Sequence, residues 1–244
     1  MNTVPNSNFI ADTMVCAMAR MIQDGETVFS GLASHMPVAA IQLARALHAP
    51  NAWQLNTAGG VNSPDAPWQS HTSIGRSLQN GTTTDFGLPE VFDLSMRGGL
   101  DVAFLSGAQF DRTGAVNTSV IGDYHRPKVR FPGGAGSAVL LPTAKRAILW
   151  RPKHDRRTFV EKVDFVTTRG NIDKVVTNLG ILTFENGAYS LLSVHPGVRV
   201  HEVQEQTGFV LDCSRATVTP EPTRKELSIL QKIDPKGYRY QEMN

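Results

Sequence analysis

The residues best suited to chemistry stand where a short apolar strand ends, in the order Asn56, Thr57, Ala58 and Gly59, with a second glycine after them. Ligands of open α/β sheets bind beside the carboxyl ends of the strands. Glycine at that edge lets a backbone or a ligand come close. We therefore expect this stretch to face a substrate.

A second glycine cluster, Gly133, Gly134, Ala135 and Gly136, lies far away in the sequence. Successive glycines can point several backbone N–H groups at an oxyanion or a carbonyl oxygen. A glycine run is also common in plain loops, so the cluster alone does not decide its role. In combination with the first stretch, it leads us to expect that the two loops meet at one substrate.

Three further features could take part in such a site. His35 stands in a small-residue loop before a helix, where a histidine can carry a proton. Arg76 lies in a long polar loop over 61–87 and could pair with a distal carboxylate through two hydrogen bonds. Basic residues cluster over 145–157, either as a solvated strand edge and loop or as an anion site. For His35 and Arg76 the alternative is an ordinary solvated or structural side chain.

The sequence lacks the motifs of several other kinds of active site, and its composition does not indicate a nucleic-acid-binding or membrane protein. The chain has no G-x-S-x-G elbow, no phosphate-binding P-loop and no histidine pair at metal-ligand spacing, so no metal site is expected. Its formal net charge of +2 favours neither a nucleic acid nor a membrane as partner. The two cysteines are far apart, and no long apolar run or signal pattern occurs. We therefore expect a cytoplasmic protein.

The elements that would position these residues alternate between helix and strand in the first half, and strands dominate later. Ser7 or Asn8 could cap the first helix, and Thr223–Glu226 fits a capping box before the last. The predicted helices cover 8–23, 37–48, 88–96, 198–206 and a segment after 226. The predicted strands cover 27–29, 52–55, 101–105, 119–121, 147–150, 159–166, 181–184 and 191–194. This pattern predicts one α/β domain over 1–244, with an open mixed, mostly parallel sheet and flanking helices.

Several motifs, in one order, resemble the β subunit of class I coenzyme A transferases. They are Val91–Gly99 (VFDLSMRGG), Leu105–Gln109 (LSGAQ), Phe131–Lys145 (FPGGAGSAVLLPTAK), Thr177–Gly180 and His195–Val198. The resemblance covers about residues 10–215. It implies an open α/β sheet, a homologous α subunit in an α2β2 assembly, and an active site between the two subunits.

One departure from the family pattern changes the expected chemistry. The family carries a nucleophilic glutamate in a motif read S-E-N-G. Here the matching position is Asn56, or Thr57 if the motif glycine sets the register, and neither is a carboxylate. Because an amide is a poor nucleophile, covalent transfer of coenzyme A through this position should fail. Binding of an acyl-CoA and polarisation of its thioester carbonyl would remain.

The chain looks most like the branch of the family that decarboxylates methylglutaconyl-CoA. That resemblance implies a lyase with no cofactor of its own, in which the thioester of the substrate accepts the electrons. Asn56, Thr57 and His35 would be catalytic; Ala58, Gly59, Arg76, Gly133, Gly134 and Ala135 would bind the substrate. The proton donor would be His35 or a residue of the α subunit. The alternatives are a ring hydrolase or hydratase, a true transferase, a non-catalytic scaffold subunit and a coenzyme A sensor without turnover.

Overall fold

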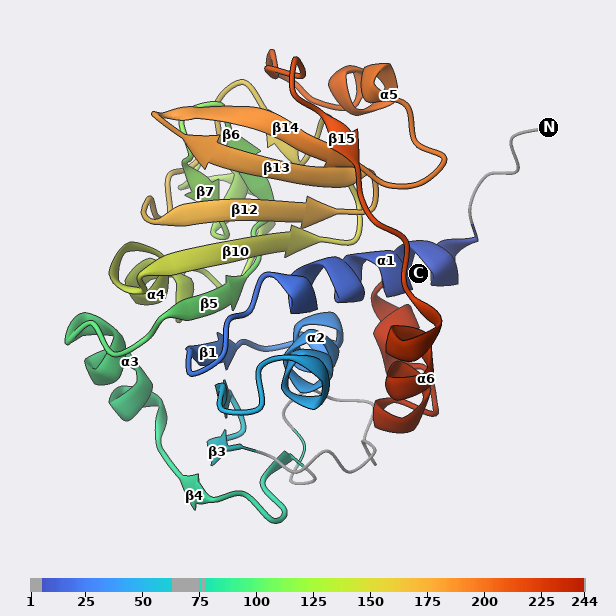
Figure 1. Cartoon of the computed structure of the whole chain (residues 1–244). Helices are drawn as coiled ribbons and strands as arrows, with labels where there is room; N and C mark the ends of the chain where they lie inside the picture. Colours follow the sequence, from blue (N-terminus) through green and yellow to red (C-terminus); the bar gives the residue numbers. More distant parts are fainter. Residues whose placement is uncertain (1–5, 63–74, 76–77, 244) are drawn as a thin grey trace. The chain divides into compact units, whose positions relative to one another are not determined.

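The computed structural model describes residues 6–62, 75 and 78–243, which form two compact units (Figure 1). The helix-rich unit takes the residues up to Phe104 together with those from Pro220 onward. The strand-rich unit is Leu105–Thr219. In the described part, no helix is long and apolar enough to cross a membrane.

The helix-rich unit contains the strand end that the sequence marks as a site. Strand β1 pairs in parallel with β5 on one side and with β2 on the other, and β3 and β4 continue antiparallel beyond β2. The elements are α1 (Ser7–Arg20), β1 (Thr27–Ser30), α2 (His35–Leu47), β2 (Trp53–Asn56), β3 (Gly60–Val61), β4 (Thr84–Asp85), α3 (Leu88–Met96), β5 (Val102–Leu105), α6 (Arg224–Ile233) and the 3-10 helix η2 (Tyr238–Met243).

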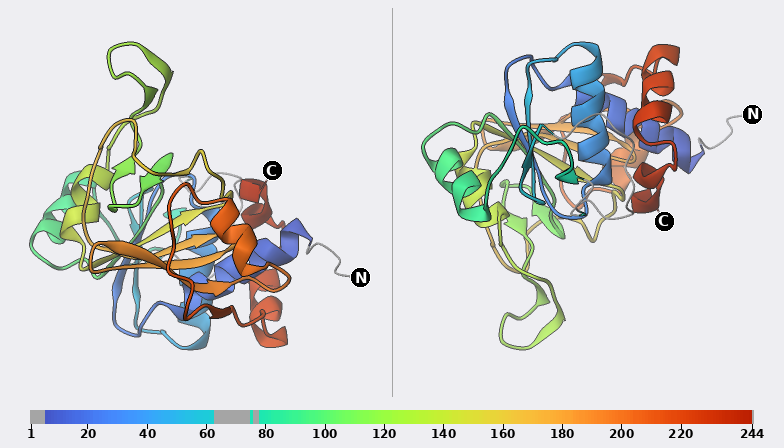
Figure 2. Two further views of the ribbon diagram at one scale, coloured as in Figure 1. Left: turned by 90° about the horizontal axis from the view of Figure 1, so that it is seen from above. Right: turned by 90° about the horizontal axis from the view of Figure 1, so that it is seen from below.

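Helix α1 is buried along its whole middle, from Ile10 to Ala19, because α2 and η2 pack against it. A helix covered on all sides must be apolar all round, and its sequence is nearly so. Its cap is Asn6, whose side chain accepts a hydrogen bond from the backbone of Asn8, so the expectation of a cap at Ser7 or Asn8 was wrong. Helices α2 and α6 lie side by side (Figure 2).

The capping box at the start of α6 is confirmed. The hydroxyl of Thr223 accepts from the backbone N–H of Glu226 at 3.2 Å, and the Glu226 carboxylate accepts from the backbone N–H of Thr223 at 2.6 Å. Arg20 of α1 donates to both carboxylate oxygens of Glu226, at 2.8 and 2.7 Å. This cap therefore also ties α6 to α1.

In the strand-rich unit, β10 pairs in parallel with β12. The next two pairings, β12 with β13 and β13 with β14, are antiparallel. The predicted hairpin is confirmed, since Asn186 and Gly187 both have positive φ between β13 and β14. The loop of the β8–β9 hairpin extends away from the rest of this unit (Figure 2). The elements are β6 (Gln109–Asp111), β7 (Val116–Asn117), β8 (Val120–Gly122), β9 (Pro127–Arg130), α4 (Ser137–Thr143), β10 (Arg146–Arg151), β11 (Phe159–Val160), β12 (Ile172–Thr177), β13 (Gly180–Glu185), β14 (Ala188–Val194), α5 (Val200–Glu205) and β15 (Thr217–Val218).

The predicted strand over 159–166 was too long, because β11 ends at Val160. Beyond it the backbone N–H groups bond to side chains instead of a strand: that of Val163 to Asp111 and that of Asp164 to Gln109. With mixed pairing and helices in the chain, the predicted fold class is confirmed. The prediction of a single domain over 1–244 stays a prediction.

Two buried histidines should make stability fall on mild acidification. His154 lies between the hydroxyls of Thr177 and Thr207, each 3.0 Å from a ring nitrogen, and burial lowers its pKa to about 3. Burial also lowers the pKa of His195 to about 4. Below about pH 6.5 the unfolded chain binds protons that the folded chain does not. Each histidine should then lower the free energy of unfolding by about 1.4 kcal/mol for each pH unit of acidification, until the pH reaches the pKa of that histidine in the folded protein.

The measurement is the melting temperature of the chain between pH 6.5 and pH 5, a window above the range in which carboxylates begin to titrate. We expect His195→Gln to flatten this pH dependence relative to the parent. His125→Gln, at an exposed position, is the matched control and should leave the slope unchanged. Parallel slopes for all three proteins would show that His195 is not held neutral by the fold.

Candidate active site

The carboxyl ends of β1 and β2 form a polar edge in the helix-rich unit. Ser30 and Asn56 are the last residues of the two strands and are partners in the parallel register. Thr57 follows, and its hydroxyl donates to the backbone carbonyl of Ser30 at 3.0 Å. The structure therefore places Asn56 and Thr57 at the strand end, where the sequence predicted them.

Asn56 is completely buried and holds the loop that follows it. Its amide nitrogen donates to the carbonyl of Leu78 at 3.2 Å, and its amide oxygen accepts from the backbone N–H of Gly60 at 3.3 Å. The backbone N–H of Gly59 also donates to the Asn56 carbonyl, at 2.9 Å. An amide can donate and accept at once, whereas an ionised carboxylate can only accept. An ionised glutamate or aspartate here could not bond the Leu78 carbonyl.

The two glycines after Asn56 are needed because backbone segments approach each other closely. Gly59 has φ +94° and packs against the carbonyl of Phe86. A Cβ on Gly60 would lie 2.5 Å from the Leu78 carbonyl oxygen. These contacts confirm the expectation that glycine lets another group come close, which here is the backbone around Leu78 and Phe86.

Gly60→Ala should therefore destabilise the chain by about 1–3 kcal/mol, because neither backbone segment can yield without strain. Gly31→Ala is the matched control, since a Cβ there meets its nearest atoms at 3.9 Å, an ordinary contact. Melting curves of both variants check the prediction. Equal melting temperatures for the two variants would show that the loop after Asn56 can accommodate a Cβ at position 60 with little loss of stability.

His35 is not a loop residue, as the sequence suggested, but the first residue of α2. It is 7% exposed, and its Nδ1 lies 3.2 Å from a carboxylate oxygen of Glu242, near the C-terminus. Ser30, Gly31 and the loop up to Ser34 connect it directly to the end of β1. His35, Asn56, Thr57 and the loop glycines thus belong to one unit.

The second glycine cluster lies in the strand-rich unit, just before α4. Gly133 and Ala135 have positive φ, and the N–H of Gly133 donates to the carbonyl of Thr118 at 3.1 Å. The N–H groups of Gly134 and Ala135 make no hydrogen bond to another residue of the described chain. Backbone donors for an oxyanion are therefore available at Gly134 and Ala135, but not at Gly133. That this loop meets Asn56 stays a prediction.

Arg76 lies outside the described residues, as does most of the polar loop around it. The basic run over 145–157 is partly neutralised: Arg146 lies 3.4 Å from Asp173, and Lys153 and Arg157 both approach Asp155. An anion site at this run stays a prediction. In the described part of the chain, no three His, Cys, Asp or Glu side chains gather as a metal site would require.

Sequence reasoning missed two polar side chains beside Asn56. The Ser30 hydroxyl and both amide atoms of Gln54 are buried and make no hydrogen bond within the described residues. Gln54 and Asn56 share a face of β2 because they are two residues apart, and Ser30 is the register partner of Asn56. Both residues could have been identified from the sequence, because they are polar residues within the short apolar strands that end at Ser30 and Asn56.

The chain is similar to known proteins over most of its length. A family model described as Coenzyme A transferase matches residues 11–206. A subunit of the 3-oxoadipate CoA-transferase of Pseudomonas knackmussii is 32% identical, over 91% of this chain and 92% of that protein. The cholesterol ring-cleaving hydrolase IpdB subunit of Mycobacterium tuberculosis is 30% identical, over 96% of this chain and 98% of that one.

Among solved structures, the decarboxylase AibA/AibB is similar with a TM-score of 0.90 and 31% identity, covering 96% of this chain and 98% of that one. Further structures of that decarboxylase have a single cysteine replaced by valine, serine, alanine or asparagine. Identity to the asparagine variant is only 30%, so the chain is a separate protein and not a version of that variant.

Proposed function

Because the chain belongs to the coenzyme A transferase family, we propose that it is the β subunit of a lyase that decarboxylates 3-methylglutaconyl-CoA to 3-methylcrotonyl-CoA. Its relatives are subunits of two-subunit enzymes, so it acts with a homologous α subunit. We further propose an α2β2 assembly in the cytoplasm. Similarity to the decarboxylase AibA/AibB over nearly the whole chain supports the choice of reaction.

One observation carries the proposal: the strand end where a transferase would present its nucleophilic glutamate presents the amide of Asn56. That amide is buried and bonded to the loop on both its nitrogen and its oxygen. It has no negative charge to attack a thioester or to repel a carboxylate bound nearby. The site therefore favours a reaction in which the thioester stays intact and another bond of the acyl group breaks.

The proposed reaction breaks the bond between the distal carboxylate and the neighbouring methylene carbon. Carbon dioxide leaves, and the electron pair spreads through the double bond onto the thioester oxygen as a dienolate. A proton then adds to the former methylene carbon, which becomes a methyl group. The thioester itself accepts the electrons, so the proposal requires no cofactor. Coenzyme A is part of the substrate.

The residues of this chain would bind the substrate and stabilise the dienolate. Backbone N–H groups of Gly134 and Ala135 would donate to the thioester oxygen, in the manner of an oxyanion hole. Asn56 and Thr57 would fix the strand end, with Ala58 and Gly59 against the substrate. Gly133 would shape its loop, since its own N–H is used within the chain. Arg76 would pair with the distal carboxylate before it leaves.

The second candidate is hydrolysis of a cyclic acyl-CoA, which the similarity to the IpdB subunit favours. It would use the same thioester-binding residues with a water nucleophile. Transfer of coenzyme A, the activity named for the 3-oxoadipate relative, needs a carboxylate that Asn56 does not provide. If this chain were only a scaffold or a coenzyme A sensor, substitutions of Asn56 would not change the turnover rate of the complex.

The test is the intact mass of the chain after incubation of the α/β complex with acyl-CoA. A transferase passes through a covalent enzyme–CoA thioester. We expect no adduct on this chain while substrate is consumed, and substitution of Asn56 by glutamate provides the reference in which an adduct can form. A coenzyme A adduct on the parent chain would overturn the proposal.

A further inference from the structure

The N-terminus of α2 is closed by a carboxylate from the other end of the chain. Its N-cap residue makes no side-chain capping bond, and Glu242 of η2 takes this place. The Glu242 carboxylate accepts from the backbone N–H groups of His35 at 2.8 Å and Met36 at 3.1 Å. A negative charge here also opposes the positive end of the helix dipole.

The same carboxylate holds the imidazole ring of His35. One carboxylate oxygen of Glu242 lies 3.2 Å from Nδ1. Because an ionised carboxylate can only accept, Nδ1 must carry the hydrogen of this bond, which leaves Nε2 as the atom that gains and loses a proton. The ring of Tyr238 packs against His35 with centroids 6.2 Å apart. Both contacts come from the segment that precedes the C-terminus.

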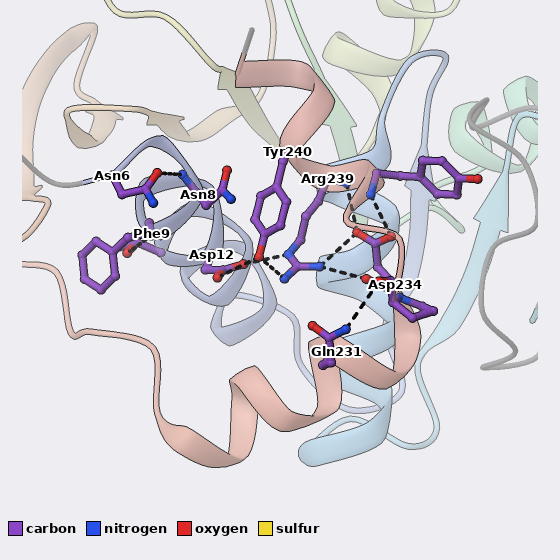
Figure 3. Close-up of polar contacts among 11 residues, drawn as sticks. Asn6, Asn8, Phe9, Asp12, Gln231, Asp234, Arg239 and Tyr240 are labelled. Carbon is purple, nitrogen blue, oxygen red and sulfur yellow. Dashed lines mark hydrogen bonds and ion pairs between the residues drawn. The ribbon is translucent and has the colours of Figure 1, made fainter.

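That segment is itself fixed by a buried ionic cluster (Figure 3). Arg239 is 2% exposed; its Nε donates to Asp12 of α1 at 2.7 Å and its Nη1 to Asp234, at the end of α6, at 3.0 Å. The hydroxyl of Tyr240 donates to the second Asp12 oxygen at 3.2 Å. Because these bonds anchor the chain three residues before Glu242, the carboxylate has a defined place at α2.

We propose that Glu242 is a positioning residue that orients His35 and sets its tautomer for proton transfer to the dienolate. This inference rests on the proposed function. The carboxylate would also stabilise the imidazolium that His35 forms when it is loaded with a proton. Among the described residues of the C-terminal segment, Glu242 and Tyr238 face the His35 ring, and the Lys236 ammonium lies 5.9 Å from the centroid of the Tyr238 ring.

The experiment combines two readouts on the α/β complex with this chain 15N-labelled at histidine. Nitrogen chemical shifts report the His35 tautomer, assigned by loss of the signals in His35→Gln, and steady-state kinetics report kcat and KM. Glu242→Ala removes the acceptor, and Glu242→Asp keeps it on a shorter arm. Glu242→Gln keeps an acceptor but loses the charge. Glu221→Ala, at an exposed position, is the matched control.

We expect the parent ring to carry its hydrogen on Nδ1 and Glu242→Ala to move it toward Nε2. In the same variant kcat should fall about tenfold or more, part of the 10²–10⁴ that a positioned acid–base group contributes, with little change in KM. Glu242→Asp should recover part of kcat, and Glu242→Gln should keep the tautomer but not the rate.

A parent ring protonated on Nε2 would overturn the inference, and so would an unchanged kcat in Glu242→Ala. Failure of the proposed function is distinguishable from both. In that case the parent complex would release no carbon dioxide from the substrate. The tautomer readout would still decide whether Glu242 orients His35.

Discussion

Asn56→Asp is expected to lower kcat for the acyl-CoA substrate by about 100-fold or more near pH 8, the size of effect that one electrostatic change near a developing oxyanion can produce. The change is isosteric, but it replaces an N–H donor by an oxygen 3.2 Å from the Leu78 carbonyl. It also places a negative charge at a completely buried position, at the strand end where we propose that the substrate binds. Steady-state kinetics of the assembled complex is the measurement.

The loss should shrink as the pH falls. Burial raises the pKa of a carboxyl group, and the protonated form can again donate to the Leu78 carbonyl. Asn186→Asp, in the exposed hairpin turn, is the matched control and should keep the parental rate at every pH. If Asn56→Asp also kept the parental rate, the strand end would not lie at the reacting atoms.

Arg239→Met is expected to produce the largest loss of stability, about 3–5 kcal/mol, because it leaves two buried carboxylates unpaired. Asp12 and Asp234 are 9% and 1% exposed, and Arg239 bonds to both (Figure 3). For a chain of this size the melting temperature should fall by about 10 °C. Differential scanning calorimetry near pH 7 gives this value directly.

The matched control is Arg157→Met, because Arg157 is exposed and lies 3.5 Å from Asp155 in a surface pair. Surface pairs contribute little, so its melting temperature should stay within about 2 °C of the parent. Similar shifts for the two variants would mean that the cluster around Arg239 is not what holds the C-terminal segment.

Local signals predicted much of the fold. The strand end at Asn56 was visible because a short apolar run stops at small polar residues and glycines. The β13–β14 hairpin follows from Asn186-Gly187, and the start of α6 from the capping box at Thr223 and Glu226. The family resemblance over about 10–215 is confirmed by the match over 11–206.

The sequence contained no clear local signal for strand β12 or for helix α4. Strand β12 was missed because Asp173 and Lys174 interrupt its apolar residues; in the structure they pair with each other, and Arg146 joins them. Helix α4 was missed because Pro142 lies inside it, directly after a glycine-rich loop. Proline removes a backbone donor and is therefore read as a helix breaker.

The contact between His35 and Glu242 could not be predicted from spacing, since 207 residues separate them. Nothing in the local pattern of either residue indicates the other. The pair exists because Arg239 brings the C-terminal segment against α1. Long-range ionic anchors of this kind depend on tertiary packing, which periodicity and turn signals do not encode.

Decarboxylation by this chain and its α subunit is tested most directly by the mass of the product that their complex forms. The substrate is 3-methylglutaconyl-CoA, supplied with and without acetate. We predict a product lighter by one carbon dioxide, formed equally in both conditions. Acetyl-CoA formed only when acetate is present would contradict decarboxylation as the reaction, because it would show that coenzyme A is transferred despite the amide at Asn56.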